Sequence, residues 1–249
     1  MGYQAGNNSQ GQYAVAMGRE AGRNSQGTNA VAMGREAGLN SQGQDAVAMG
    51  NSAGRNSQGQ YAVAIGRNAG LNSQGQDAIA MGNSAGYTSQ GQDAVAMGYF
   101  AGYDSQGTYA VAMGREAGFA SQGPYAVAMG YAAGNDSQGQ YAVAIGQEAG
   151  FASQGTNAVA IGNGAGKTNQ PANSIMLNAS GAELNGSTAS AFYVNPIRSV
   201  NSGASTNVMH YDAATNEVTL NTGKTFVIPH PKDETRYLVH ACLEGPEAG

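Results

Sequence analysis

The sequence predicts an all-β protein: a parallel β-roll solenoid with coils of sixteen residues, followed by a small β-rich C-terminal segment. An Ala-Val-Ala-Met-Gly string, first seen at residues 14–18, occurs ten times at sixteen-residue spacing, with Ile as the only replacement for Val or Met. A Ser-Gln-Gly string keeps the same spacing from Ser9 to Ser153, and an Ala-Gly pair lies between the two strings. A fixed period with recurring small and apolar positions is typical of a solenoid, in which each coil buries its apolar side by stacking on its neighbours.

The apolar string is predicted to be a short strand that is buried on both faces. Side chains alternate along a strand, so Val15 and Met17 share one face and Ala14 and Ala16 share the other. We expect the larger Val and Met side chains to fill the inside of the roll, because the gap between two sheets needs bulk. A helix is disfavoured, because each sixteen residues contain three glycines that cost about 1 kcal/mol each relative to alanine.

The second strand of each coil is expected near Ser25, and glycines are expected at the corners. Gly18, Gly22 and Gly27 are predicted to adopt positive φ there, which is inexpensive only for glycine. Stacked coils place like residues above like. The columns that contain Asn24 and Gln26 could therefore form amide ladders, or could serve only as soluble turns.

The alanine face is predicted to bind other copies of the chain. It is flat and apolar, and one coil has no further apolar residues with which to cover it, so an identical chain is the simplest partner. The predicted interface residues are Ala14, Ala16, Ala30, Ala32, Ala46, Ala48, Ala62, Ala64, Ala78, Ala80, Ala94, Ala96, Ala110, Ala112, Ala126, Ala128, Ala142, Ala144, Ala158 and Ala160.

The repeat resembles a known family. The strings AVAMG and AVAIG, with NSIMLN at residues 173–178, resemble the NSVAIG-type repeats of the YadA-like head of trimeric autotransporter adhesins. The resemblance covers about residues 2–178 and implies a left-handed parallel β-roll and a homotrimer joined along one axis. The sixteen-residue period and the constant Ser-Gln-Gly string depart from that family's pattern.

The sequence predicts that the chain is divided into three segments. Residues 2–178 form the repeat domain, whose last coil is a cap because Asn169 and Pro171 replace the usual Ser and Gly. Residues 179–190 form a linker or a loose final coil, and residues 191–249 form the β-rich segment. Within that segment we expect a strand at 191–194, a hairpin of 207–211 with 217–220, and two further strands at 225–228 and 237–240.

The C-terminal segment carries a second resemblance. Residues 193–198, 226–231 and 237–247 resemble segments of fibre-like proteins of phages and large DNA viruses, where they lead towards assembly or chaperone modules. This resemblance implies a viral surface or tail fibre. The chain starts inside a repeat and stops within this segment, so we expect it to be a fragment of a longer protein.

Charge and hydropathy narrow the possible partners. The net charge is −5 and the repeats have no basic stripe, so we expect no nucleic-acid binding. No run approaches the roughly 18 apolar residues of a membrane span, so we expect no direct membrane insertion. An extracellular or virion-surface location is expected.

The residues suited to catalysis are few. His240, Cys242 and Glu244 would share one side of a strand, so a Cys-His nucleophile pair is conceivable, but we favour a semi-polar strand face. His210, His230 and His240 lack the spacing of metal ligands. We therefore expect no enzyme activity, no catalytic residue, no metal site and no cofactor.

Aromatic residues gather in the second half of the repeats, where the first half has Arg and Leu. Exposed aromatic rings on a rigid scaffold suit contacts with glycans or proteins, although some rings could only cover the roll or a trimer seam. The candidate ligand-contact residues are Tyr87, Tyr99, Phe100, Tyr103, Phe119, Tyr131 and Phe151.

The predicted function is a non-enzymatic segment of a trimeric surface fibre, viral or phage in origin, that contacts a host receptor or glycan. One alternative is the head of a bacterial trimeric autotransporter adhesin. A second is an ice-binding solenoid, although the threonines at 28, 88, 108 and 156 are too scattered for a regular array. A third is a self-processing peptidase or chaperone in the C-terminal segment.

Overall fold

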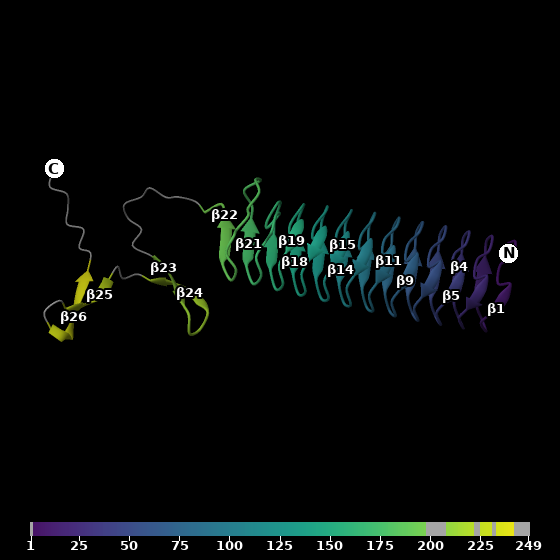
Figure 1. Cartoon of the computed structure of the whole chain (residues 1–249), viewed down its shortest axis with the longest axis horizontal. Helices are drawn as coiled ribbons and strands as arrows, with labels where there is room; N and C mark the ends of the chain where they lie inside the picture. The colour runs from purple at the N-terminus through teal and green to yellow at the C-terminus, as the bar shows by residue number, and fades with distance from the viewer. Residues whose placement is uncertain (1, 198–207, 222–224, 231–232, 242–249) are drawn as a thin grey trace. The chain divides into compact units, whose positions relative to one another are not determined.

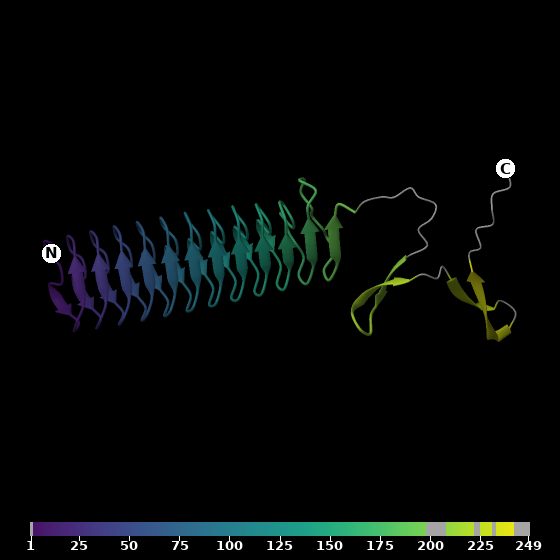
Figure 2. The same cartoon turned by 180° about the vertical axis from the view of Figure 1, so that it is seen from behind.

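A computed structural model describes residues 2–197, 208–221, 225–230 and 233–241. The chain divides into two compact units, Met1–Ile197 and Arg198–Gly249. In the first unit, short strands and turns repeat as stacked coils along one axis, as the two opposite views show (Figures 1 and 2).

Each complete coil contributes one three-residue strand to each of two parallel sheets. The first sheet contains β1 (Asn8–Gln10), β3 (Asn24–Gln26), β5 (Asn40–Gln42), β7 (Asn56–Gln58), β9 (Asn72–Gln74), β11 (Thr88–Gln90), β13 (Asp104–Gln106), β15 (Ala120–Gln122), β17 (Asp136–Gln138) and β19 (Ala152–Gln154). The second contains β2 (Val15–Met17), β4 (Val31–Met33), β6 (Val47–Met49), β8 (Val63–Ile65), β10 (Ile79–Met81), β12 (Val95–Met97), β14 (Val111–Met113), β16 (Val127–Met129), β18 (Val143–Ile145), β20 (Val159–Ile161), β21 (Ile175–Asn178) and β22 (Phe192–Asn195).

The register of the sheets stacks like residues above like. Each repeat strand pairs in parallel with its counterpart sixteen residues later, as Val31 pairs with Val47 and Met33 with Met49. The predicted fold class is thus confirmed: an all-β solenoid of about twelve turns, with no helix among the described residues. Equivalent positions form columns along the solenoid axis, and each column is named below by one member.

Alanines, and not Val and Met, fill the inside of the roll. The core consists of the Ala32 column of the second sheet and the Ala37 column of the following turn, closed at one end by Met176. In the alternating strand, burying the alanine forces its two neighbours outward, so Val31 and Met33 point away from the core. The prediction that Val and Met lie inside is therefore wrong.

The predicted alanine interface is wrong for the same reason. Apart from the half-buried Ala14 and Ala16 of the first coil, every alanine predicted for the interface is 0% exposed within a single chain. A side chain with no exposed surface cannot contact another chain. The sequence argument assigned bulk to the interior, but a second alanine column and a glutamine column already occupy that space.

The buried glutamine explains much of the repeat. Gln26 Nε2 donates to the carbonyl oxygens of Val15, 2.8 Å away in the preceding coil, and Ala30, 3.2 Å away. These hydrogen bonds offset the cost of burying an amide. A Cβ at Gly22 would lie 2.5 Å from Gln26 Oε1, so the Ala-Gly pair makes room for the glutamine of Ser-Gln-Gly.

Two of the three predicted corner glycines have positive φ. Gly18 and Gly22 have φ values of 128° and 52°, as predicted. Gly27 does not; instead, its Cβ would lie 2.5 Å from the backbone of Gly43 in the next coil, so close spacing between coils requires glycine there. Non-glycine residues such as Glu20 and Ser25 also have positive φ, 58° and 55°, which the sequence analysis missed.

The solenoid extends beyond residue 178, where the repeat domain was predicted to end. β22 pairs in parallel with β21, with Phe192 beside Ile175, and so completes the second sheet. Between them, the Leu184 carbonyl accepts a hydrogen bond from Gly166 N at 2.8 Å, and Leu184 packs on the core. Of the two alternatives for residues 179–190, the structure therefore favours the final coil over the linker.

The second unit contains two antiparallel hairpins. β23 (Val208–Asp212) pairs with β24 (Glu217–Asn221), and β25 (Thr225–His230) pairs with β26 (Asp233–Ala241). The first pair is the predicted hairpin; for the second pair the sequence predicted the two strands but not their pairing. Cys242 and Glu244 of the conceivable nucleophile site lie outside the described residues.

Candidate functional site

The outer side of the second sheet is a continuous apolar surface, here called the apolar face. One of its columns contains Val15, Val31, Val47, Val63, Ile79, Val95, Val111, Val127, Val143, Val159, Ile175 and Phe192. The other contains Met17, Met33, Met49, Ile65, Met81, Met97, Met113, Met129, Ile145, Ile161, Leu177 and Val194.

These side chains remain substantially open to solvent in a single chain. Met17 is 47% exposed and Ile161 is 40% exposed, and no charged residue interrupts either column. A contiguous apolar surface of this extent usually marks an interface. The sequence analysis predicted an apolar strip on this strand, but placed it on the wrong side of the strand.

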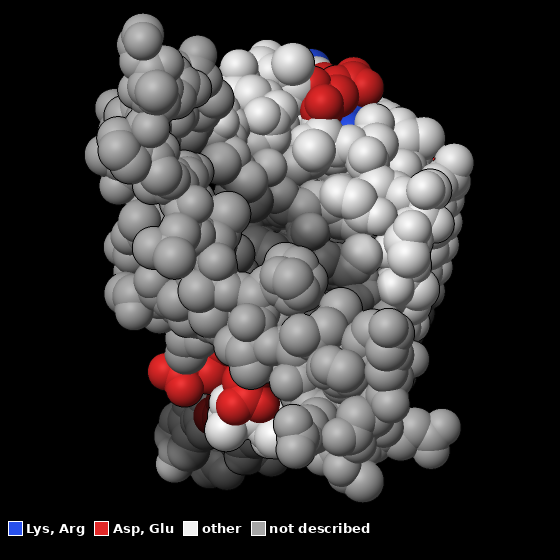
Figure 3. Space-filling model, turned by 90° about the vertical axis from the view of Figure 1, so that its left-hand side faces the viewer, with Lys and Arg blue, Asp and Glu red and all other residues white. Residues whose placement is uncertain are grey.

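Charged side chains are sparse in the repeats and occur in small groups. One group that contains both acidic and basic side chains is visible near the top of the end view in Figure 3. At the turn that leads from the second sheet back to the first, here called the outer turn, Glu20 pairs with Arg19 at 3.2 Å and with Arg23 at 3.3 Å. The arginines are the more exposed partners, and such surface pairs contribute little, about 0–1 kcal/mol each. These pairs indicate no binding chemistry.

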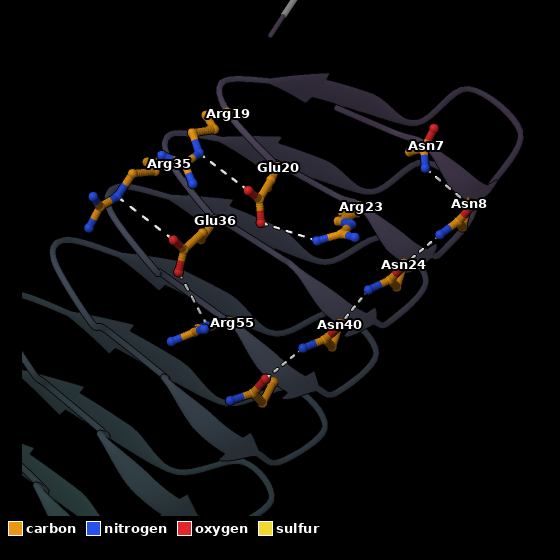
Figure 4. A network of polar contacts seen from close by, with 11 residues as sticks. Asn7, Asn8, Arg19, Glu20, Arg23, Asn24, Arg35, Glu36, Asn40 and Arg55 are labelled. Carbon is orange, nitrogen blue, oxygen red and sulfur yellow. Dashed lines mark hydrogen bonds and ion pairs between the residues drawn. The ribbon is translucent and has the colours of Figure 1, made fainter. Parts of the chain in front are cut away.

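The first sheet carries an asparagine ladder on its outer side. Asn8, Asn24, Asn40 and Asn56 each donate through Nδ2 to Oδ1 of the next asparagine at 2.8–2.9 Å, ending at Asn72. Figure 4 shows the start of this ladder, at Asn8, Asn24 and Asn40. The ladder prediction is confirmed for this column. Its role is to tie successive coils together, and it leaves this side of the roll polar.

The aromatic residues form a cluster at the outer turn of the middle coils. Tyr103 stacks between Tyr87 and Phe119, with ring centroids 4.8 and 5.0 Å away and interplanar angles of 12° and 5°. Phe100 lies edge-on to Tyr103 at 5.0 Å and to Tyr99 at 4.3 Å. Five of the seven candidate ligand-contact residues are thus in one contiguous cluster.

The other two candidates lie at its margin or beyond it. The Arg115 guanidinium lies 5.7 Å from the Tyr99 ring centroid and 5.5 Å from that of Tyr131, and so links Tyr131 to the cluster. Phe151 makes no aromatic contact with the cluster among the described residues.

A groove opens beside this cluster. It has a volume of about 340 Å³ and is lined by Phe100, Tyr103, Glu116, Phe119 and Asn135. Partial burial raises the pKa of the Tyr103 phenol, and nearby Tyr87 and Asp104 raise it further. The groove thus combines aromatic rings with a hydroxyl, a carboxylate and an amide.

A second aromatic ladder was missed by the sequence analysis. Tyr109, Tyr125 and Tyr141 stack with centroids 5.0 and 5.1 Å apart at the turn that follows the first sheet. They are 46–50% exposed. The signal was available, because three tyrosines at exact sixteen-residue spacing must fall in one column of a solenoid.

The YadA head domain repeat matches the chain twice, at residues 41–69 and 151–165. No curated protein and no solved structure matches the chain. These matches suggest an adhesin-like segment of a surface-exposed, extracellular fibre. They do not extend to the C-terminal segment, whose resemblance to viral fibres has no support from them. Within the described residues, no helix is long and apolar enough to cross a membrane.

Proposed function

We propose that this chain is a structural, non-catalytic segment of a trimeric surface fibre, in which three parallel copies associate through the apolar face. The observation that carries the proposal is the pair of apolar columns that run along all twelve strands of the second sheet. Proteins with YadA head repeats are typically trimeric, which supports three as the number of copies.

The energetics favour covering this face. Completing the burial of a half-buried Val or Met side chain is worth about 1 kcal/mol. Two columns of twelve such residues outweigh the roughly 4–15 kcal/mol of translational and rotational freedom that association costs. Because the apolar side chains of the interior are almost all alanines, a large part of the available apolar burial lies at this interface.

Parallel in-register coils also suit a cyclic assembly. If one rung of the apolar face contacts a neighbouring copy, every rung above it can make the same contact, because the repeat is constant. Such a contact repeats around the axis until the ring closes. The result is a rod in which apolar side chains converge on the axis and the polar first sheet faces outward.

The finer proposal is that this fibre contacts a host receptor or glycan through the aromatic cluster, and that a virion carries it. The aromatic groove supports the contact, and the sequence resemblance of residues 193–198, 226–231 and 237–247 to phage and large DNA virus fibres supports the carrier. A bacterial surface is the alternative carrier. Immunogold labelling of virions and cells with an antibody against the repeats distinguishes the two.

Light scattering of the full chain tests the assembly. We expect a mass of three times 25.1 kDa. The double variant Val95→Asp/Met97→Asp places charges on one rung of the apolar face and is expected to lower the mass or prevent assembly. Its matched control, Ser89→Asp/Ser105→Asp, places the same charges on the exposed side of the first sheet and is expected to remain trimeric. A monomeric wild-type chain contradicts the proposal.

A further inference from the structure

We propose that the groove lined by Phe100, Tyr103, Glu116, Phe119 and Asn135 binds a ring of a neutral glycan. The inference rests on the proposed function, since it names the receptor chemistry that the fibre would contact. All five groove residues belong to a single chain and lie outside the apolar face.

The first argument is an aromatic face with no aromatic neighbour. Tyr103 is covered on both sides, by Tyr87 at 4.8 Å and by Phe119 at 5.0 Å. The next residue of that column is Asn135, and among the described residues no ring stacks on the Asn135 side of Phe119. Phe100 stands beside the stack, since its centroid is 5.0 Å from Tyr103 and 6.1 Å from Phe119. A sugar ring presents a flat array of C–H groups that can pack on such a face.

The second argument is the set of polar groups around that face. Asn135 Nδ2 donates to the Glu116 carbonyl oxygen at 3.0 Å, which leaves Asn135 Oδ1 as an acceptor. Glu116 Oε1 accepts a hydrogen bond from Arg115 Nε at 3.2 Å, and within the described part of the chain Oε2 has no partner. Together with the Tyr103 hydroxyl, these oxygens can bind sugar hydroxyls, which act as both donors and acceptors.

The third argument is charge, which selects a neutral sugar. Arg115 neutralises Glu116 and already lies over the rings of Tyr99 and Tyr131, so the chain itself supplies the cation that this aromatic cluster attracts. Asp104 and Asp136 follow Tyr103 and Asn135 directly in the sequence and would repel the carboxylate or sulfate of an acidic sugar. Both cationic and anionic ligands are therefore disfavoured.

The fourth argument is the placement of Phe100. Its φ is 56°, in the left-handed region, where a bulky side chain is strained. The equivalent positions of other coils have polar or small residues, among them Ser52 and Ser84. A phenylalanine is thus present at a position where it costs stability, in a coil that lines the groove.

Ligand-observed NMR on the full chain tests the inference, with methyl glycosides of galactose, mannose and N-acetylglucosamine as neutral probes. Sialyllactose is the acidic probe and choline the cationic probe. We expect saturable binding of at least one neutral sugar with a Kd near 1 mM, about 4 kcal/mol of affinity, and weaker binding of both charged probes. Choline binding without neutral-sugar binding, or no sugar binding at the highest soluble concentration, overturns the inference.

Repeat-matched variants locate the site. Phe119→Leu introduces the residue that Leu39 and Leu71 supply in the same column, so the coil is expected to fold, and binding should weaken at least tenfold. Phe151→Leu makes the same change outside the groove and should leave the Kd unchanged. Equal weakening by both variants overturns the assignment.

Masses measured on the same samples separate the two proposals. A trimer that binds no sugar overturns only the glycan site, whereas a monomer that binds sugar overturns only the fibre.

Discussion

The two sheets of the solenoid share one interior but present opposite outer surfaces. On the first sheet, asparagine amides connect successive coils and the serines face solvent. On the second, the corresponding positions are Val and Met, which make no polar contact through their side chains. The comparison indicates that folding of a coil depends on the interior columns, whereas binding of other molecules depends on the columns of the outer surfaces.

The interior tolerates few substitutions, because alanine methyl groups fill it and glutamine amides in it donate hydrogen bonds to backbone carbonyls. A change there affects both sheets together. A change on one outer surface should affect only what that surface does. The following predictions test this separation, from the largest expected effect to the smallest.

An acidic residue in the shared interior should destroy both sheets. Ala112→Asp buries an unpaired carboxylate among fully buried alanines, at a cost of several kcal/mol. We expect loss of the strand signal in far-ultraviolet circular dichroism. Ser121→Asp, on the exposed side of the first sheet in the next coil, is the control and should keep the wild-type spectrum.

A side chain at a corner glycine should strain the path between the sheets. Gly114 has a φ of 127°, and a Cβ there would lie 2.5 Å from the carbonyl oxygen of Gly130. Gly114→Val is expected to lower the free energy of unfolding by about 2–4 kcal/mol. Gly181 has a φ of 79°, and a Cβ there would have no atom within 4 Å. Gly181→Val therefore introduces backbone strain without a clash, and should lower the free energy of unfolding by less in the same denaturant titration. Equal losses would show that contact between coils contributes nothing.

Loss of a buried glutamine should weaken the link between the sheets without removing it. Gln106 Nε2 donates to the carbonyls of Val95 at 2.8 Å and Ala110 at 3.2 Å. Gln106→Leu leaves both carbonyls without this donor and is expected to cost about 1–3 kcal/mol by thermal unfolding. Gln92→Leu, at an exposed turn position, should change stability by less than about 0.5 kcal/mol.

The asparagine ladder should contribute least to stability, because it lies on the solvent-facing side of the first sheet. Asn56→Ala removes two ladder hydrogen bonds and is expected to cost about 0.5–1.5 kcal/mol. Thr88→Ala, in the same column beyond the ladder, is the matched control. A change in the mass of the assembly in the Asn56→Ala variant would contradict the separation of the two surfaces, since this surface is not expected to hold chains together.

Most of the fold could be predicted from the sequence, because a strict period fixes the stacking and the register. The strand that contains Ala32 was predicted, as was a continuous apolar strip along one side of these strands. The side of the strand was not, because volume alone cannot show that Gln26 enters the interior. That inference requires knowing that Gly22 leaves space for the Gln26 amide, and this proximity follows only from the three-dimensional structure.

The aromatic cluster was predictable only in part. The shared column of Tyr87, Tyr103 and Phe119 follows from the period alone, as does the ladder of Tyr109 and Tyr125. The groove does not, because its shape depends on Phe100 standing beside the stack and on the turn of the Asn135 amide towards Glu116.

Thiol reactivity at matched positions of the two outer surfaces tests the central claim most directly. In a Cys242→Ser background, Met97→Cys lies on the apolar face and Ser105→Cys lies on the exposed side of the first sheet. We expect the thiol at position 105 to react with a maleimide at the rate of a free thiol, and the thiol at position 97 to react only after denaturation. Equal rates in the native protein would contradict the claim that the apolar face is covered by other copies of the chain.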